Sequence, residues 1–357
     1  MRWFCSLTCF AVLILTASTL ADPIPKKYQA SIKRGLQWLQ QRQNKDGSWT
    51  AKAGSYRCSM TSLAGLALLM DGSTTTKGPY KKNLQRAVEW LLEQQQQSGL
   101  FLDKDDKAAA ARYVFEHGYS LLFLSHVLQK ETKKKRAAKL KTALTDAVQF
   151  SRNAQTPRGG WGYVTAVDGN NFDEGAATVV QMMGLRAAKD AKIRMPQNVF
   201  EDGAKYFQAA TNKDGGIIYS VSSGRVGSGR PALTAGAMAV LLGTKELKKD
   251  LAKKWLTFVT RQIKLGQRMG HAAFTHFHYA QVAYRLGEKG HGKIHKESKP
   301  ADRLTWTQYR KATFVDLKRR QSKDGSWPGS IGPEYETAIA LCILQLDKEA
   351  LAIAQQK

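Results

Sequence analysis

Two kinds of helical segment alternate along the chain. One kind combines an apolar stripe with a charged stripe, as in SIKRGLQWLQQRQ, KKNLQRAVEWLLEQ and DLAKKWLTFVTRQ. The other kind is rich in small residues and apolar almost all round, as in MTSLAGLALLM, HGYSLLFLSHVL, GAATVVQMMGLRAA, LTAGAMAVLLG, HFHYAQVAYRLG and ETAIALCILQL. A helix with one apolar stripe buries one face, whereas a helix that is apolar on all sides is fully buried. The pattern therefore predicts an outer and an inner layer of helices, with GIIYSVSS as the one stretch that could form a strand hairpin.

A short polar motif recurs behind each outer segment. QRQNKDGSW, which ends at Trp49, and RRQSKDGSW, which ends at Trp327, are nearly identical, and four weaker copies lie between them at intervals of roughly 50 to 60 residues. Glycine permits the chain to reverse where a helix ends, and tryptophan can pack on the next repeat with its N–H bonded. We interpret the motif as structural in all six loops, and this interpretation has its weakest support at Trp161 in RGGWGY. The residues that carry the repeat are Gln43, Gly47, Trp49, Gly99, Gly160, Trp161, Gly216, Gln321, Gly325 and Trp327.

Six outer–inner helix pairs either stack as an open solenoid or close into a ring. An open solenoid needs polar caps over its terminal repeats. Here the first and last repeats carry the strongest copies of the motif, and both keep an apolar inner segment. We therefore predict an all-α (α/α)6 toroid in which repeat one packs on repeat six. It would occupy residues 22–357 as one domain, with repeats near 28–71, 80–129, 137–190, 198–244, 248–288 and 303–346.

The motif Gln-x-x-Asp-Gly-Ser-Trp resembles the QW motif of the prenyltransferase and squalene-oxidase repeat family. That family includes squalene–hopene cyclases and protein prenyltransferases and builds α/α toroids. The match is close at both ends of the chain, and the resemblance runs from about residue 28 to residue 346. It implies a terpenoid-cyclase-like fold. It implies less about activity, because one fold hosts many functions.

The first residues of the chain are typical of a secretory signal peptide. A basic start is followed by an apolar run from Phe4 to Leu15 and by the small residues of TASTLA, which ends at Ala21. We expect cleavage near Ala21 and export to the periplasm or the exterior. Of the four cysteines, only Cys58 and Cys342 would remain, and we expect two buried thiols rather than a disulfide framework.

The chain is strongly basic, with 55 Lys and Arg against 29 Asp and Glu. Such a balance favours attraction to anionic surfaces such as envelope polymers, acidic glycans or lipid headgroups. No nucleic-acid-binding signature is present, and we expect no specific nucleic-acid partner and a monomeric protein. Basic residues gather in the segments that follow the inner helices, where cations are favoured near helix C-termini.

The string LDKDD, from Leu102 to Asp106, is similar to the Asp-x-Asp-Asp of squalene–hopene cyclases. The resemblance implies that its middle acid, Asp105, would protonate an alkene, since neighbouring groups in cyclases hold that acid protonated. In cyclases, however, the string abuts an inner helix, and here it lies about ten residues too early. Three carboxylates before an alanine run are also what a helix N-terminus favours. We therefore expect Asp103, Asp105 and Asp106 to cap a helix rather than to act in catalysis.

Aligning the inner helices at Thr61, Gly118, Gly175, Thr234 and Thr337 gathers ionisable residues at one rim of the ring. All inner helices run in the same direction in such a toroid, so their N-termini share that rim. Repeats two and three each supply two ionisable groups, which is more than capping requires, and we expect at least three of the rim residues to face one cavity. His276 and His278 lie two residues apart, so they cannot both point inward. The candidate site residues are Glu116, His117, Asp173, Glu174, His276, His278 and Glu336.

The sequence leaves three functions open. The first is an exported toroid that binds a hydrophobic chain or an extended peptide in its central cavity or at its rim, without the usual catalytic motifs. The second is an enzyme of the terpenoid-cyclase or prenyl-transfer type, and the third is a protein that binds or cleaves an acidic polysaccharide. No cofactor motif is present, and the Asp-x-Cys step of zinc-dependent prenyltransferases is missing, so we expect no cofactor and no metal.

Overall fold

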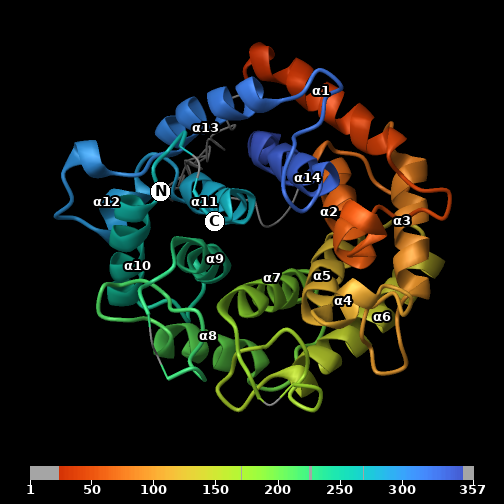
Figure 1. Ribbon diagram of the computed structural model, residues 1–357, viewed down its shortest axis with the longest axis horizontal. Coiled ribbons are helices and arrows are strands. Elements are labelled where there is room, and N and C mark those ends of the chain that lie inside the picture. The colour runs from red at the N-terminus through yellow and green to blue at the C-terminus, as the bar shows by residue number, and fades with distance from the viewer. Residues whose placement is uncertain (1–23, 170, 225–226, 268, 349–357) are drawn as a thin grey trace, which may run out of the picture.

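The protein is a ring of helix pairs (Figure 1). The structure is a computed structural model that describes residues 24–348, apart from residues 170, 225–226 and 268. The inner helices of the described chain are α2 (Arg57–Met70), α5 (Tyr113–Lys130), α7 (Gly175–Asp190), α9 (Pro231–Leu241), α11 (Ala272–Leu286) and α14 (Pro333–Leu344). The outer helices are α1 (Lys26–Gln41), α3 (Lys81–Glu93), α6 (Lys134–Ala154), α8 (Val199–Ala209), α10 (Lys249–Gln262) and α13 (Trp306–Arg320). The predicted all-α toroid is confirmed.

The two layers follow the two sequence patterns. On the outer helix α3, the buried residues Leu84, Ala87, Val88 and Leu91 form one stripe at helical spacing. On the inner helix α2, every residue from Cys58 to Met70 is buried. Helices that are apolar on all sides reach this burial only inside a second layer, and this is why the ring has two layers.

The ring is closed by direct contact between the first and last repeats. Helix α2 packs on α14, and α1 lies against both α13 and α14. Several polar contacts fix the seam. Among them, Trp38 Nε1–H donates to Asp324 Oδ2 at 3.1 Å, Gln321 Nε2–H donates to Ser31 O at 2.9 Å, and Arg42 pairs with Glu334. The two strong copies of the motif are therefore neighbours in space.

The motif loops of repeats one to four and of repeat six hold two successive outer helices together. In repeat three, Gln155 Nε2 donates to Gly159 O at 2.7 Å and to Val199 O, at the start of the next outer helix, at 3.0 Å. Gly159 has a φ of +87°, and a Cβ on it would lie 2.2 Å from Asp202 O. Four other motif glycines likewise lie directly against a backbone carbonyl of the next outer helix: Gly47, Gly99, Gly215 and Gly325. The last of these contacts Arg34 O across the seam.

The structure corrects the position of this glycine in repeats three and four. The sequence singled out Gly160 and Gly216, but the left-handed backbone that requires glycine belongs to the residue before each of them. Gly160 and Gly216 instead lie beneath aromatic rings, those of Tyr206 and Phe258. Trp161 is fully buried, and its indole N–H donates to Ser151 O at 2.8 Å, as those of Trp49 and Trp327 do to Leu39 O and Leu317 O.

The hairpin that GIIYSVSS could form is absent from the described residues, where strand pairing is limited to isolated bridges such as Thr211 with Ile217. The backbone N–H groups of Val221 and Ser222 donate to the carboxylate of Asp173 instead of to a partner strand. The short segments α4 (Lys107–Ala110), α12 (Gly290–Ile294), η1 (Lys52–Gly54), η2 (Pro300–Asp302) and η3 (Leu346–Lys348) lie outside the two layers of helices.

Cys58 and Cys342 are both buried, unbonded thiols, as expected from the sequence. None of the described helices has both the length and the apolar character needed to cross a membrane. The expected signal peptide and the C-terminal residues 349–357 lie outside the described residues.

Candidate functional site at one rim of the ring

Hydrogen bonds from the motif loops set the register of the inner helices. The backbone N–H groups of Trp49, Trp161 and Trp327 donate to the hydroxyls of Thr61, Thr178 and Thr337 at 2.9 to 3.0 Å. In repeat four, Ile217 N–H donates to Thr234 Oγ1, and in repeat two, Phe101 N–H donates to His117 Nδ1. The equivalent positions are therefore His117 and Thr178, not the Gly118 and Gly175 that the sequence alignment placed in step.

His117 takes the place of the threonine in this pattern. Its ring is fully buried, and its Nε2 lies 3.1 Å from both Ala147 O and Ser151 Oγ on the neighbouring outer helix. Burial lowers the pKa of His117 to about 3, so the ring is neutral. Its contacts account for both ring nitrogens and fix the loop of repeat two to its helix.

Glu116 is a buried acid between two inner helices. Its carboxylate accepts the backbone N–H of Ser59 at 2.9 Å and also the Ser59 hydroxyl, so it caps the first turn of α2 from the neighbouring repeat. Burial raises the pKa of Glu116 to about 7, although the bonds from Ser59 lower it. Glu116 is thus a carboxylic acid that keeps its proton over most of the acidic range.

The three carboxylates of LDKDD lie around the N-terminus of α2 and the start of α4. Asp103 pairs with Arg57 at 2.5 Å, and Asp106 accepts the N–H of Ala109 at 2.9 Å, which makes it the N-cap of α4. Asp105, in contrast, is exposed. An exposed carboxylate lacks the enclosed surroundings in which the acid of the cyclases is held protonated, so the position of Asp105 does not match that role.

Asp173 and Glu174 are adjacent but serve different contacts. The Asp173 carboxylate accepts hydrogen bonds from Tyr206 OH, Ser220 Oγ and the backbone of residues 221–222, which fixes the loop before α9. Glu174 caps α7 by accepting Ala177 N–H at 2.8 Å. The two carboxylates of repeat three therefore do not form a pair.

Glu174 nevertheless lies beneath a group of residues that the sequence did not single out. We call Arg112, Tyr163, Tyr219 and Arg230 the arginine–tyrosine cluster. The guanidinium of Arg112 lies 4.7 Å from the ring centre of Tyr163, that of Arg230 lies 4.6 Å from the ring centre of Tyr219, and the two tyrosine hydroxyls are hydrogen-bonded to each other. Arg112 and Arg230 are the N-cap residues of α5 and α9, which flank α7.

The cluster combines exposed cations with partly covered rings. Both arginines are exposed, and both tyrosines are half-buried. Phe115 and Phe172 pack beside them, with ring centres 5.9 Å and 6.1 Å from that of Tyr163. Burial raises the pKa of Glu174, while the Ala177 N–H and the charges of Arg230 and Arg112 lower it. One acid therefore balances at most one of the two guanidinium charges.

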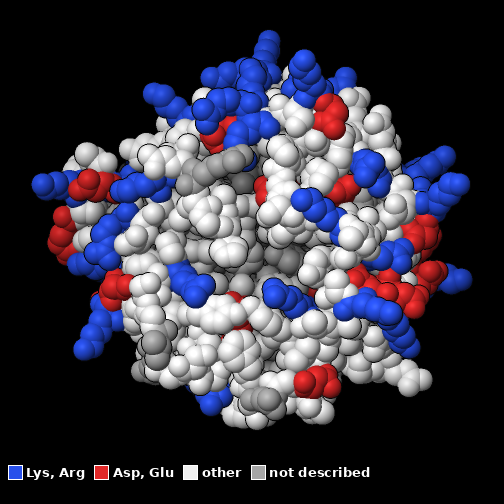
Figure 2. Space-filling view, viewed as in Figure 1, with Lys and Arg blue, Asp and Glu red and all other residues white. Residues whose placement is uncertain are grey.

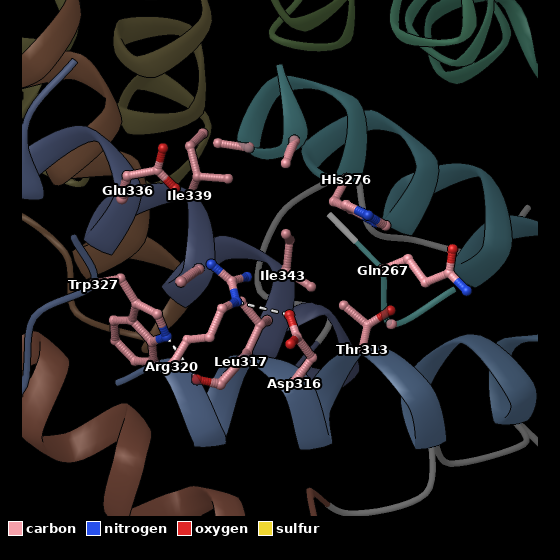
Figure 3. A pocket seen from close by; sticks show the side chains of 14 residues that line it. Gln267, His276, Thr313, Asp316, Leu317, Arg320, Trp327, Glu336, Ile339 and Ile343 are labelled. Atoms are coloured by element: carbon pink, nitrogen blue, oxygen red, sulfur yellow. Dashed lines mark hydrogen bonds and ion pairs between the residues drawn. The ribbon is translucent and has the colours of Figure 1, made fainter. Parts of the chain in front are cut away.

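A second group of candidates lines a small cavity between α11, α13 and α14 (Figure 3). His276 and Glu336 both line it, together with Thr313 and the ion pair of Asp316 with Arg320, whose atoms are 2.7 Å apart. The cavity volume is about 30 Å³, which is room for a water molecule rather than for a substrate. Two of the expected rim residues thus share a cavity, while Glu116, His117 and Asp173 are engaged in separate contacts.

His278 points to the middle of the ring. It lies on α11 and is fully buried, and its Nε2 is 3.0 Å from Sδ of Met183 on α7. Burial lowers the pKa of His278 to about 4. Because α7 and α11 are separated by α9 in the ring, this contact joins two inner helices that are not neighbours and narrows any central cavity at that level.

The face seen in Figure 2 has Lys and Arg side chains mainly around its periphery, while its middle is largely uncharged.

The sequence contained cues to the arginine–tyrosine cluster. Arg112 and Arg230 both stand directly before an inner helix. Tyr163 and Tyr219 follow the motif by two residues in successive repeats, at Trp161 and Ile217. Comparing equivalent positions after each motif, rather than at the helix starts alone, would have brought these two tyrosines together.

The geometry can be compared with known proteins. The family model of the squalene–hopene cyclase C-terminal domain matches residues 7–130, about a third of the chain. A type II terpene cyclase from Scytonema, solved with merosterolic acid A, superimposes with a TM-score of 0.57 at 15% identity, covering 91% of this chain and 98% of that one. The chain has the α/α toroid fold of the terpene cyclases. No curated protein matches the sequence.

The same toroid fold is shared with glycan-degrading proteins. An α-1,6-mannanase from Salegentibacter superimposes with a TM-score of 0.61 at 7% identity, covering 92% of this chain and 100% of that one. An inactive variant of that mannanase, solved with α-1,6-mannotriose, gives a TM-score of 0.60 at 6% identity and covers 90% and 99%. Identities this low show a shared fold and leave the ligand of this toroid to be inferred from its own residues.

Proposed function

We propose that this toroid is exported and binds an acidic glycan chain at the arginine–tyrosine cluster. The observation that carries the proposal is the pair of exposed arginines, each held over a tyrosine ring, on either side of the N-terminus of α7. A guanidinium stacked on a ring is oriented in advance and keeps its N–H edge free to bind a carboxylate with two parallel hydrogen bonds. The excess of Lys and Arg over Asp and Glu would draw an anionic chain toward the protein.

The residues between the two arginines suit a sugar ring. Tyr163 and Tyr219 contribute hydroxyl groups, and Phe172 lies beside both tyrosine rings, with ring centres 6.1 and 6.2 Å away. Aromatic side chains with a polar edge supply apolar contact area and hydrogen bonds together. A chain of sugar acids offers apolar ring faces and regularly spaced carboxylates, so it can engage the aromatic residues and both arginines at once.

Two observations favour this function over a hydrophobic chain held in the centre of the ring. The contact between His278 and Met183 narrows the centre, and the acid that the cyclase resemblance implies, Asp105, is exposed. An anionic chain bound at the rim requires neither an open centre nor that acid.

The proposal is tested by calorimetric titration of the mature protein with a short oligogalacturonate and with neutral α-1,6-mannotriose. We expect the acidic chain to bind, and to bind more weakly as salt is raised. Arg112→Gln and Arg230→Gln should each weaken binding about tenfold or more, because a charge-assisted hydrogen bond contributes about 1.5–3 kcal/mol.

Arg194→Gln is the matched control. Arg194 is exposed and follows the C-terminal end of α7, so its removal changes the net charge equally without touching the cluster. We expect it to change the affinity by less than twofold. An equal loss in Arg194→Gln, or tighter binding of mannotriose than of the acidic chain, would show that the cluster is not an acidic-glycan site.

A further inference from the structure

The contact between His278 and Met183 joins two inner helices that are not neighbours. His278 Nε2 and Met183 Sδ are 3.0 Å apart, and both side chains are almost completely buried. The other ring nitrogen, Nδ1, lies 2.7 Å from Phe274 O, one turn earlier on α11. The imidazole therefore has two close polar neighbours, a carbonyl oxygen and a thioether sulfur.

Neither neighbour can donate a hydrogen bond. A carbonyl oxygen and a thioether sulfur only accept, and a neutral imidazole has one N–H to give. The carbonyl is much the better acceptor, so the proton belongs on Nδ1. Nε2 then presents its lone pair to the sulfur lone pairs at 3.0 Å with no proton between them. Burial without a carboxylate partner disfavours a second proton on the ring. Protonation of Nε2 therefore does not relieve the repulsion between the two lone pairs.

A metal cation bound to both Nε2 and Sδ would remove this repulsion. An imidazole that donates one N–H to a backbone carbonyl and turns its other nitrogen inward has the arrangement typical of metal-binding histidines. Thioether sulfur is a soft ligand that selects Cu(I), and imidazole also suits copper. We propose that His278 and Met183 bind a soft monovalent copper ion in the centre of the ring. Hard cations are excluded as occupants because neither ligand is an oxygen.

The surroundings allow an ion to enter and be held. Phe274 lies between His278 and the rim, is only half-buried, and has its ring centre 4.3 Å from that of His278. We expect rotation of this ring to admit an ion to the pair. Methionine has three rotatable bonds, so Met183 can withdraw its sulfur to admit an ion without moving α7.

Neither the spacing of residues in the sequence nor a cluster of His, Cys, Asp and Glu side chains indicates this pair. In the described part of the chain, no group of three His, Cys, Asp or Glu side chains is placed to hold a metal ion. His278 and Met183 are 95 residues apart and belong to repeats five and three. Only the packing of α7 and α11 around α9 brings them together, so the absence of a metal motif in the sequence says nothing about this site.

The test is an anaerobic titration of the reduced mature protein with Cu(I) against a chromophoric Cu(I) chelator. Met183→Leu removes the sulfur and nearly preserves the side-chain volume. We expect the unmodified protein to bind one more equivalent of Cu(I) than Met183→Leu. We also expect Cu(I), but not Zn(II), to raise the thermal unfolding midpoint of the unmodified protein, since a ligand that binds only the folded state stabilises it.

Met182→Leu is the matched control, because Met182 is the adjacent residue and packs on Gly203, on the outer side of α7. It should bind Cu(I) as the unmodified protein does. His278→Gln should lose the same equivalent as Met183→Leu, and if it does not fold, Met183→Leu decides alone. Unchanged Cu(I) stoichiometry and affinity in Met183→Leu, or an equal loss in Met182→Leu, would overturn the proposal.

Discussion

At the scale of single residues, buried ionisable groups connect the repeats. Glu116 caps α2 from α5, and His117 connects the loop of repeat two to α6. These groups were candidates for chemistry because they stand at helix starts. The structure shows that each also forms hydrogen bonds to a neighbouring helix. A buried acid with a raised pKa must then affect how stability depends on pH.

The Glu116→Gln variant tests this dependence. Burial raises the pKa of Glu116 from 4.5 to about 7 in the folded protein, so the folded state holds a proton that the unfolded state has released. The free energy of unfolding contributed by this group is therefore full below about pH 4.5 and falls as the pH rises to about 7. The loss is on the order of 3 kcal/mol. Glutamine does not titrate, so urea unfolding at pH 5 and pH 8 should show a smaller decrease in the variant. A decrease equal to that of the unmodified protein would contradict this role.

At the scale of elements, the motif loops act as clamps between successive outer helices. The glycine of each strong copy adopts a left-handed backbone and lies directly against a carbonyl of the next outer helix. The glutamine before it donates to its own loop and to that helix. Repeat five departs from this pattern, because Gly266 is 3.7 Å from its nearest neighbour, Ala312 O, measured from an added Cβ. The small cavity with His276 and Glu336 lies beside this loosened clamp.

Gly159→Ala and Gly54→Ala distinguish two reasons for glycine at a position: a left-handed backbone and a close approach to a neighbouring helix. Both residues have positive φ, +87° and +74°, but a Cβ on Gly159 would lie 2.2 Å from Asp202 O, whereas nothing lies within 4 Å of one on Gly54. We expect Gly54→Ala to cost about 1–2 kcal/mol for the left-handed backbone alone. Gly159→Ala should cost at least about 1–3 kcal/mol more because two helices must separate. Equal urea midpoints for the two variants would show that the close approach contributes nothing.

At the scale of the whole molecule, the proposed glycan-binding residues and the basic segments of the chain lie at opposite ends of the inner helices. The arginine–tyrosine cluster lies at the rim that carries the inner-helix N-termini, and the basic segments after the inner helices lie at the other end of those helices. An acidic glycan in an extracellular layer is a fitting partner for such a protein only if the chain is exported.

Export is tested by expressing the full chain in a bacterial host with an intact secretion system and measuring the intact mass of the protein outside the cytoplasm. We expect a mature N-terminus at Asp22, directly after the small residues Thr19 and Ala21. Replacing Ala21 with a bulky Phe should block this cleavage, since signal peptidase accepts only small residues there. Recovery of the full-length chain in the cytoplasm, with no shortened form outside it, would contradict export.

The sequence by itself determined the layers, the repeat and the closure of the ring. Apolar periodicity reports burial, because a helix such as α2 that is apolar on every side cannot face water. The matching motifs at Trp49 and Trp327 identified the two ends as neighbours. Both properties are local, since they depend on spacing along one helix or one loop.

Only the tertiary structure decided which side chains share a place. Asp173 and Glu174 are adjacent in sequence, yet one binds a loop and the other caps a helix, because their side chains leave the backbone in different directions. The arginine–tyrosine cluster draws its residues from three successive repeats, and the His278–Met183 pair joins two inner helices that are not neighbours. Such contacts depend on the rotation of each helix about its own axis. That rotation is set by packing against neighbours far away in the chain, and no local pattern records it.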